Sequence, residues 1–292
     1  MYDLRTPQFQ RFISPAKGSL ELWRLMVSLI ICILTWLIFA KIIKVLFFPY
    51  LETSTPSTGN SPAGMIYILS SFLGLIFALL LVAKLHNRPL KSFFGSGSSF
   101  INHFFYSFLL CLIFCSVFAV TINIITGNIV TQNLSISQWS RYLMIGLPLL
   151  LIQVTTEELL FRGYLVQQLA ARYNSILIWM VLPSIVFGLA HYDPQNYGKA
   201  ALPIVGLLTV YGVFATDLTR RTGNLSLAMG FHLSNNIFTI FIFGNTSKFS
   251  GLSLLTAPTF LENHENLKAI LISEFLFIIL VWYILVRFFR GL

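Results

Sequence analysis

Apolar residues fill about eight long stretches of this chain, and short polar segments separate them. The stretches cover about residues 24–48, 65–83, 100–125, 142–170, 176–191, 200–218, 225–243 and 267–289. Each is long enough, or nearly so, for the roughly 20 residues of a helix that crosses the hydrocarbon core of a bilayer. The pattern predicts an all-α fold, a polytopic integral membrane bundle of about eight transmembrane helices.

The composition supports the same class of protein. Of the 292 residues, 56% are hydrophobic and only 10% are charged, whereas globular chains are about 25% charged. The net charge of +9 comes from basic residues that are scattered along the connections between apolar stretches. We therefore expect contact with the lipid bilayer and no binding of nucleic acid.

The basic residues also predict a topology. They lie in the N-terminal tail, in the second, fourth and sixth connections, and at the C-terminus, whereas residues 49–64 and 127–140 contain no Lys or Arg. Cytoplasmic loops of membrane proteins are enriched in these residues. Both termini are thus predicted to be cytoplasmic.

No repeat, low-complexity tract or separate soluble domain is evident. We expect residues 1–23 to form a cytoplasmic N-terminal tail and residues 24–292 to form a single membrane-embedded domain. The sequence gives no indication of the oligomeric state.

Two adjacent carboxylates interrupt the fourth apolar stretch, where ionisable groups are costly and commonly functional. On a helix, Glu158 and Arg162 are neighbours on one face, whereas Glu157 is rotated by about 100°. Arg162 can therefore neutralise Glu158 and leave Glu157 free. The alternative is a structural charge cluster in which Arg162 bridges both carboxylates.

A histidine in the next stretch can reach the same depth. If the fourth and fifth stretches form a hairpin, Glu157 lies about 16 residues before the turn and His191 about 18 after it. At 1.5 Å per residue, their depths differ by about 3 Å. His191 could equally be a satisfied group at a helix end.

His232 and Asn236 lie four residues apart in the seventh stretch and share a helical face, whereas Asn235 is rotated off it. They are candidates for the same site. An interhelical hydrogen-bonding pair is the alternative interpretation.

These motifs, Glu157-Glu158-x-x-x-Arg162, Phe187-x-x-x-His191 and His232-x-x-x-Asn236, resemble those of the CPBP family of CAAX-protease and bacteriocin-processing intramembrane endopeptidases. The resemblance covers roughly residues 140–245, which would be the catalytic core. It implies a glutamate-dependent protease that cleaves a peptide or a membrane-protein substrate without a cofactor. For a bacterial relative, the location would be the inner (plasma) membrane.

The chemistry of amide hydrolysis assigns the roles. Glu157 would take a proton from water and His191 would orient that water. His232 and Asn236 would donate hydrogen bonds to the tetrahedral intermediate. Glu158 with Arg162 would support the site structurally.

Other functions remain open at this point. Two histidines and a glutamate can bind zinc, although the compact His-Glu-x-x-His helix of zinc peptidases is absent. A non-enzymatic membrane regulator or immunity protein could use the same cavity to bind a partner. A transporter is disfavoured, because no two equivalent halves are evident. The sequence does not identify the substrate or show whether it is prenylated.

Overall fold

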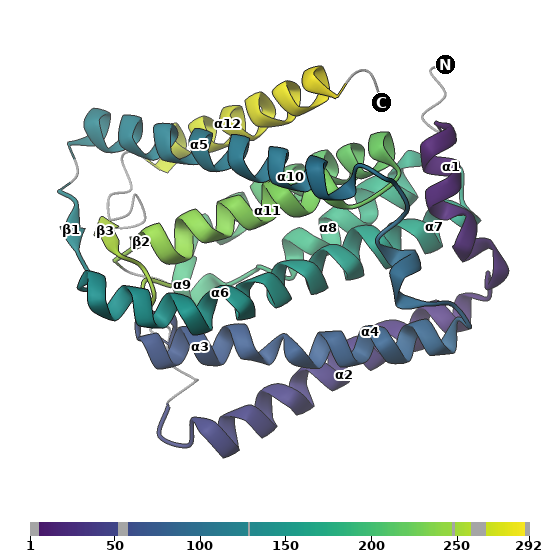
Figure 1. Ribbon diagram of the computed structural model, residues 1–292, viewed down its shortest axis with the longest axis horizontal. Coiled ribbons are helices and arrows are strands. Elements are labelled where there is room, and N and C mark those ends of the chain that lie inside the picture. Colours follow the sequence, from purple (N-terminus) through teal and green to yellow (C-terminus); the bar gives the residue numbers. More distant parts are fainter. Residues whose placement is uncertain (1–5, 52–57, 128, 247–248, 258–266, 290–292) are drawn as a thin grey trace.

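The computed structural model describes residues 6–51, 58–127, 129–246, 249–257 and 267–289. Each predicted apolar stretch corresponds to one helix or to consecutive helices. These are α2 (Leu22–Phe47), α3 (Pro62–Ser71) with α4 (Leu73–Leu85), α5 (Phe100–Thr126), α6 (Ile136–Glu158) with α7 (Val166–Arg172), α8 (Leu182–Leu189), α10 (Ala201–Thr222), α11 (Ser226–Ile237) and α12 (Leu267–Phe288). Most of these helices run along the long axis of the molecule (Figure 1). The predicted all-α membrane bundle is confirmed.

Within the described ranges, six helical segments are long and apolar enough to cross a membrane. The fifth and seventh predicted stretches are shorter. The fifth gives the apolar segment Leu177–Leu189, and α11 has 12 residues before the π-helical turn Phe238–Ile242. At 1.5 Å per residue, α11 alone spans about 18 Å, less than the roughly 30 Å of a hydrocarbon core. Residues 226–234 of α11 are all buried inside the bundle, whereas Leu177, Leu182 and Leu189 of the other short segment are exposed.

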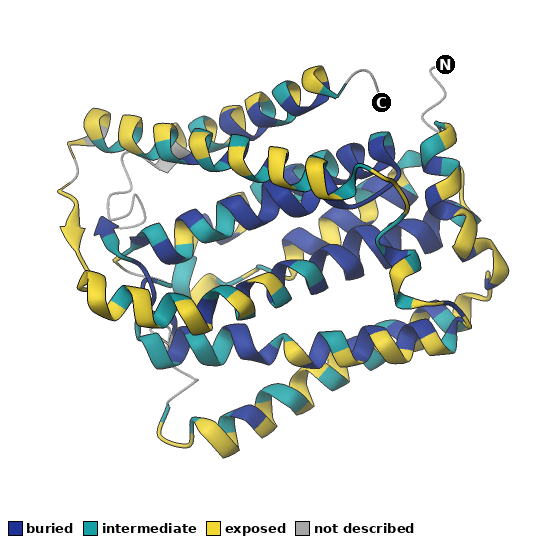
Figure 2. Ribbon diagram, viewed as in Figure 1, coloured by how far each residue is buried: buried dark blue, intermediate teal, exposed yellow. Residues whose placement is uncertain are grey.

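The outer helices are largely exposed and surround a more buried centre (Figure 2), and many of the exposed side chains are apolar. Ile33 on α2, Ile113 on α5 and Leu276 on α12 are each more than half exposed. Such surfaces suit lipid, which is as apolar as the side chains themselves. The buried polar residues concentrate instead on α6, α7, α10 and α11.

A small sheet joins two connections that the sequence analysis treats as loops. Its strands are β1 (Thr131–Gln132), β3 (Leu255–Ala257) and β2 (Phe243–Asn245), in the order β1-β3-β2. β1 pairs antiparallel with β3, and β2 pairs parallel with it. The sheet lies at the end of the bundle opposite both termini (Figure 1).

The N-terminal segment packs on the bundle from residue 6 onwards, while residues 1–5 of the expected tail lie outside the described residues. The Thr6 hydroxyl accepts a hydrogen bond from the backbone N–H of Phe9 and caps helix α1 (Pro7–Ile13). Phe9 and Phe12 are buried, and the Phe9 ring centroid lies 4.8 Å from that of Trp179. Most of the segment expected to precede the embedded domain is therefore part of its packing.

A buried polar cluster fixes this segment to the helices beneath it. His86 lies with its Nδ1 2.7 Å from the Ser19 hydroxyl and its Nε2 2.9 Å from the Tyr164 hydroxyl. Burial, and then the positive charge of Arg88, lowers the pKa of His86 to about 4. The imidazole is therefore neutral at physiological pH.

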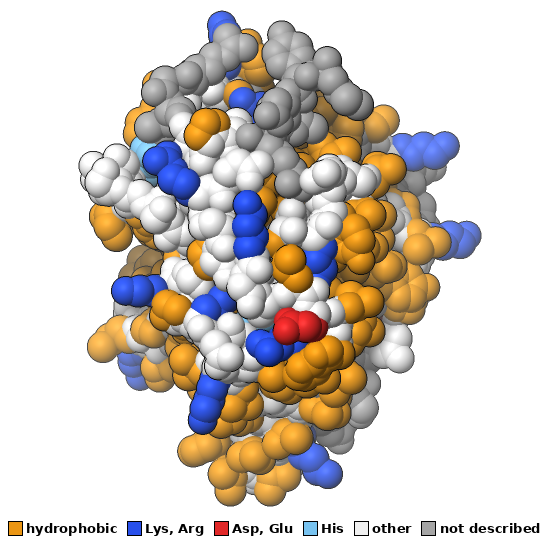
Figure 3. Space-filling view, turned by 90° about the vertical axis from the view of Figure 1, so that its right-hand side faces the viewer, with side chains coloured by type: hydrophobic (Ala, Val, Ile, Leu, Met, Phe, Trp, Pro, Cys, Tyr) orange, Lys and Arg blue, Asp and Glu red, His pale blue; other side chains and the backbone are white. Residues whose placement is uncertain are grey.

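Basic residues mark the end of the bundle at which the termini lie. The last turns of α4, α7, α10 and α12 all carry Lys or Arg: Lys84, Arg172, Arg220 with Arg221, and Arg287. Cations are stabilised near the negative C-terminal ends of helix dipoles. Figure 3 views this end and shows many Lys and Arg side chains across it.

Candidate active site

The two glutamates of the first motif end helix α6, and the chain continues as the π-helical turn Leu159–Leu165. Glu158 and Arg162 are almost completely buried. Arg162 Nη1 donates a hydrogen bond to Glu158 Oε1 over 2.9 Å. Interrupted helices of this kind are frequent at functional sites. The arginine neutralises one carboxylate of the pair, as the spacing predicts.

His232 lies between the two glutamates. Its Nδ1 is 2.8 Å from Glu158 Oε1, and its Nε2 is 3.6 Å from Glu157 Oε2. Because a carboxylate accepts hydrogen bonds, Nδ1 carries the proton. The sequence analysis did not predict this contact between His232 and Glu158. We call Glu158, Arg162 and His232 the paired cluster.

Close packing of α11 against α5 positions His232 beside the two glutamates. A Cβ atom on Gly230 would lie 2.5 Å from the Phe104 carbonyl oxygen, so α11 can approach α5 only with glycine here. The Ser107 hydroxyl of α5 donates to the Leu227 carbonyl over 2.8 Å and holds the same contact. His232 is thereby turned away from α5 and toward α6.

His191 follows the end of α8, outside the paired cluster. Its Nδ1 lies 2.8 Å from the Phe187 carbonyl oxygen. A carbonyl oxygen only accepts, so Nδ1 is the donor, and the neutral ring keeps a lone pair on Nε2. His191 and Glu157 line one cavity, so the two helices of the predicted hairpin bring them to a common space.

Asn236 reaches that cavity with the help of a residue that the sequence analysis missed. Its Nδ2 donates to Gln153 Oε1 over 3.0 Å. Gln153 lies four residues before Glu157 and therefore on the same face of α6. That spacing was a signal available in the sequence. Asn235, expected off this face, also lines the cavity and donates to Asn236 Oδ1 over 3.2 Å.

The cavity has a volume of about 520 Å³. Glu157, His191 and Asn236 belong to its wall, and we call them the cavity group. Glu157 is only 6% exposed, and its Oε2 has no hydrogen-bond partner within the described part of the chain. The remaining wall is mainly apolar, with further polar side chains at Gln153, Asn235, Tyr197 and Glu274.

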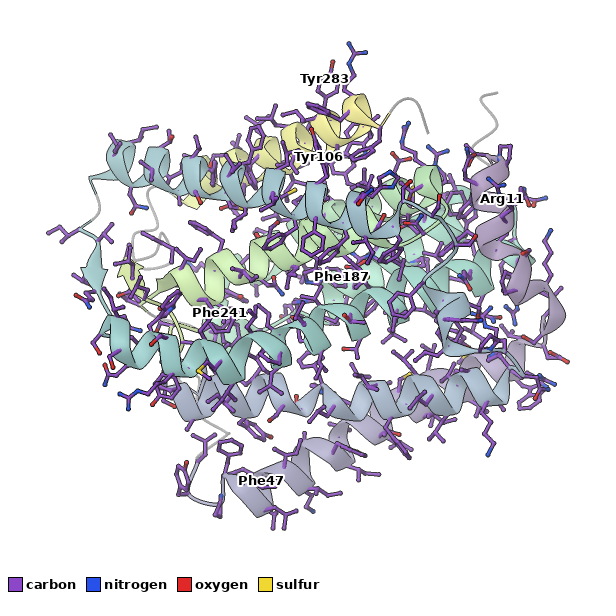
Figure 4. All side chains as sticks on the ribbon, in the orientation of Figure 1. Arg11, Phe47, Tyr106, Phe187, Phe241 and Tyr283 are labelled. Carbon is purple, nitrogen blue, oxygen red and sulfur yellow. The ribbon has the colours of Figure 1, made fainter. Side chains whose placement is uncertain are left out.

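Phe187 contacts a member of the paired cluster and a member of the cavity group. The Arg162 guanidinium lies 4.2 Å from its ring centroid, a cation–π distance. The His191 ring centroid lies 4.7 Å from it on another side. Figure 4 shows Phe187 inside the bundle, whereas Phe47 and Tyr283 extend from the outer helices. The phenylalanine of the second motif thus contacts both parts of the site.

Across the described ranges, no three His, Cys, Asp or Glu side chains are grouped so as to hold a metal ion. Catalysis without a metal stays a prediction, as do the roles assigned to the individual site residues.

A comparison with known protein families matches the part of the chain that contains the site. Residues 139–238 match the model of the family described as type II CAAX prenyl endopeptidase Rce1-like. That range contains every residue of the paired cluster and the cavity group. The predicted resemblance to CAAX-type proteases is confirmed, and it supports a protease of this general type within an integral membrane protein.

The chain is also similar over most of its length to a bacterial protein. It is 25% identical over 264 residues to the uncharacterized protein YyaK of Bacillus subtilis (strain 168). The matched region covers 85% of this chain and 87% of that protein. No solved structure gives a significant match.

Proposed function

We propose that this chain is an intramembrane endopeptidase that hydrolyses a peptide bond with a water molecule activated by Glu157. The observation that carries the proposal is the difference between the two adjacent carboxylates. Glu158 is held through Oε1 by Arg162 and His232 and is not among the described residues that line the cavity, whereas Glu157 lines the cavity and has no arginine partner among the described residues. Only the second arrangement leaves a carboxylate available as a base.

In the first step, water binds between Glu157 and His191. The unprotonated Nε2 of His191 accepts one hydrogen bond from the water, and the Glu157 carboxylate accepts the other and takes that proton. The resulting hydroxide attacks the carbonyl carbon of the scissile amide. Glu157 then returns the proton to the leaving amine, so the carboxylate is regenerated.

Asn236 and His232 would stabilise the oxyanion of the tetrahedral intermediate. Asn236 uses one N–H for Gln153 and has a second one to offer. His232 uses Nδ1 for Glu158, so it can donate from Nε2 only when it is protonated.

The function is tested by comparing membranes that contain the wild type or Glu157→Gln. Peptides released by the wild type alone, identified by mass spectrometry, would support proteolysis and name the peptide or membrane-protein substrate. Purified protein in lipid vesicles should cleave the same sequence without an added cofactor. Unchanged peptide patterns, together with a partner that co-purifies with both proteins, would favour a non-enzymatic regulator.

We further propose a bacterial plasma membrane location with both termini in the cytoplasm. The basic end of the bundle (Figure 3) and the similarity to a Bacillus subtilis protein support this orientation and location. Single cysteines at the exposed positions Ser14 and Ser137 should react with an impermeant reagent from opposite sides. Labelling of both in intact cells would contradict the topology.

A further inference from the structure

A second glutamate lines the cavity, and it comes from outside the region that matches the family. Glu274 lies on the last helix, α12, whereas the match ends at residue 238. It lines the same cavity as Glu157. Neither the sequence motifs nor the proposed mechanism gives it a role.

Helix packing directs this side chain inward. Phe277 is one turn beyond Glu274 and shares its face of α12. The Phe277 ring lies 4.7 Å from the Phe118 ring of α5, centroid to centroid, and both rings also line the cavity. In contrast, Phe275 and Leu276 are exposed on the outer side of the helix.

The carboxylate of Glu274 has no partner in the described structure that would explain its place in the cavity wall. No described residue forms a hydrogen bond or an ion pair with its carboxylate. A carboxylate that served only to hold helices together in a membrane would pair with a cation or with polar side chains. Arg162 shows this behaviour toward Glu158 in the same molecule. The open side chain of Glu274 points instead to a ligand.

The charge of the cavity wall indicates the kind of ligand. Glu157 and Glu274 both contribute to it, and none of its described residues is Lys or Arg, although the chain carries a net charge of +9. Much of the remaining wall consists of aromatic and aliphatic side chains, including Phe72, Phe238 and Phe243. An apolar segment with one positive group matches this wall, whereas a free carboxylate would meet like charge and no described cation.

We propose that Glu274 is a specificity-determining residue that receives a basic side chain of an otherwise apolar peptide segment bound in the cavity. The proposal rests on the peptidase function, and it adds the substrate class. Glu157 would act on the scissile bond while Glu274 fixes which residue of the segment enters its part of the cavity. A volume of about 520 Å³ falls within the usual range for sites that enclose most of a small ligand.

The test uses binding, so it does not depend on cleavage. Fluorescent apolar peptides with an amidated C-terminus carry a single lysine at successive positions, and their partners carry norleucine at the same position. Affinities are measured for Glu157→Gln protein in detergent micelles. At one lysine position we expect about tenfold tighter binding than for norleucine, equivalent to about 1.4 kcal/mol.

The decisive comparison adds a second substitution to the same protein. In Glu157→Gln with Glu274→Gln, the preference for lysine should disappear while norleucine peptides bind as before. Glu274→Leu serves as a second variant, and thermal unfolding checks that each protein is folded. Glu21→Gln is the matched control, because Glu21 is exposed and far in sequence from the cavity wall.

The outcomes separate this inference from the proposed function. A lysine preference that depends on Glu274 supports the inference even if the wild type cleaves none of the peptides. Equal affinities for the lysine and norleucine peptides at every position, or a lysine preference that survives Glu274→Gln and Glu274→Leu, would overturn it. Tighter binding of peptides with a free C-terminal carboxylate would also overturn it.

Discussion

The paired cluster and the cavity group meet at two adjacent residues of α6, Glu158 and Glu157, yet these two carboxylates have different surroundings. In the paired cluster, Glu158 Oε1 accepts from both Arg162 and His232. In the cavity group, Glu157 lines the cavity, and among the described residues no arginine pairs with it. In the mechanism we propose, the first carboxylate supports the fold and the second acts as the base. Adjacent residues of one type can therefore carry separate duties.

The largest effect on activity is expected at Glu157. Glu157→Gln keeps the size of the side chain and removes the base, so cleavage should fall by about 10²–10⁴-fold. Thermal unfolding should stay near that of the wild type, because the buried arginine of the site pairs with Glu158 and not with Glu157. Initial rates and unfolding curves of the purified proteins measure both quantities. A fully active Glu157→Gln would refute the assignment of the base.

The largest effect on stability is expected at Glu158. Glu158→Ala leaves Arg162 and His232 without their shared acceptor in a buried site. Breaking a buried ion pair typically costs about 3–5 kcal/mol, so yield and unfolding temperature should drop together with activity. As a control, Glu21→Ala breaks the exposed ion pair with Arg24 and should cost less than about 1 kcal/mol.

A double substitution sharpens the same comparison. Replacing Glu158 and Arg162 together by Gln and Met removes the buried cation along with its partner. Part of the stability lost in Glu158→Ala should return, since no unpaired guanidinium remains. If the double variant is no more stable than Glu158→Ala, the pair does not account for the loss.

Much of the site and of the fold could be predicted from the spacing of residues within single segments of the sequence. The four-residue separation of Glu158 and Arg162 is sufficient to predict their contact on a helix. Uniform apolar stretches were sufficient to predict the helical bundle, because a bilayer requires backbone groups to be satisfied within each segment. The common depth of Glu157 and His191 could also be predicted. A helix has a fixed rise per residue, so the number of residues between each side chain and the turn gives its depth.

Contacts between helices distant in sequence could not be predicted. The bond from His232 to Glu158 depends on the rotation of α11, which Gly230 and its close approach to α5 help to set. Glu274 reaches the cavity only because α12 packs on α5. Likewise, the small sheet depends on two connections that meet at one end of the bundle. Spacing along one segment carries no information on such rotations.

A smaller effect should follow when the support of the cavity group is removed. Gln153→Leu deletes the acceptor that holds the Asn236 amide, so this donor loses its orientation but is not removed. We expect kcat/KM to fall by about tenfold, less than the 10²–10³-fold typical of deleting an oxyanion donor. Gln132→Leu, on the exposed strand β1, is the control and should be neutral. A loss as large as that of Asn236→Ala would instead indicate that Gln153 itself contacts the substrate.

The smallest effect, no change at all, is expected on removal of metals. In the paired cluster, Nδ1 of His232 is already engaged by Glu158, and Arg162 supplies the positive charge that a metal would otherwise bring. In the cavity group, Asn236 is a poor zinc ligand compared with His, Cys or a carboxylate. Protein that has been exhaustively chelated and then dialysed should retain its rate of cleavage, and elemental analysis should find no stoichiometric zinc. Activity that is lost with zinc and restored with it would assign Glu157, His191 and His232 to a metal site and remove the distinction between the two groups.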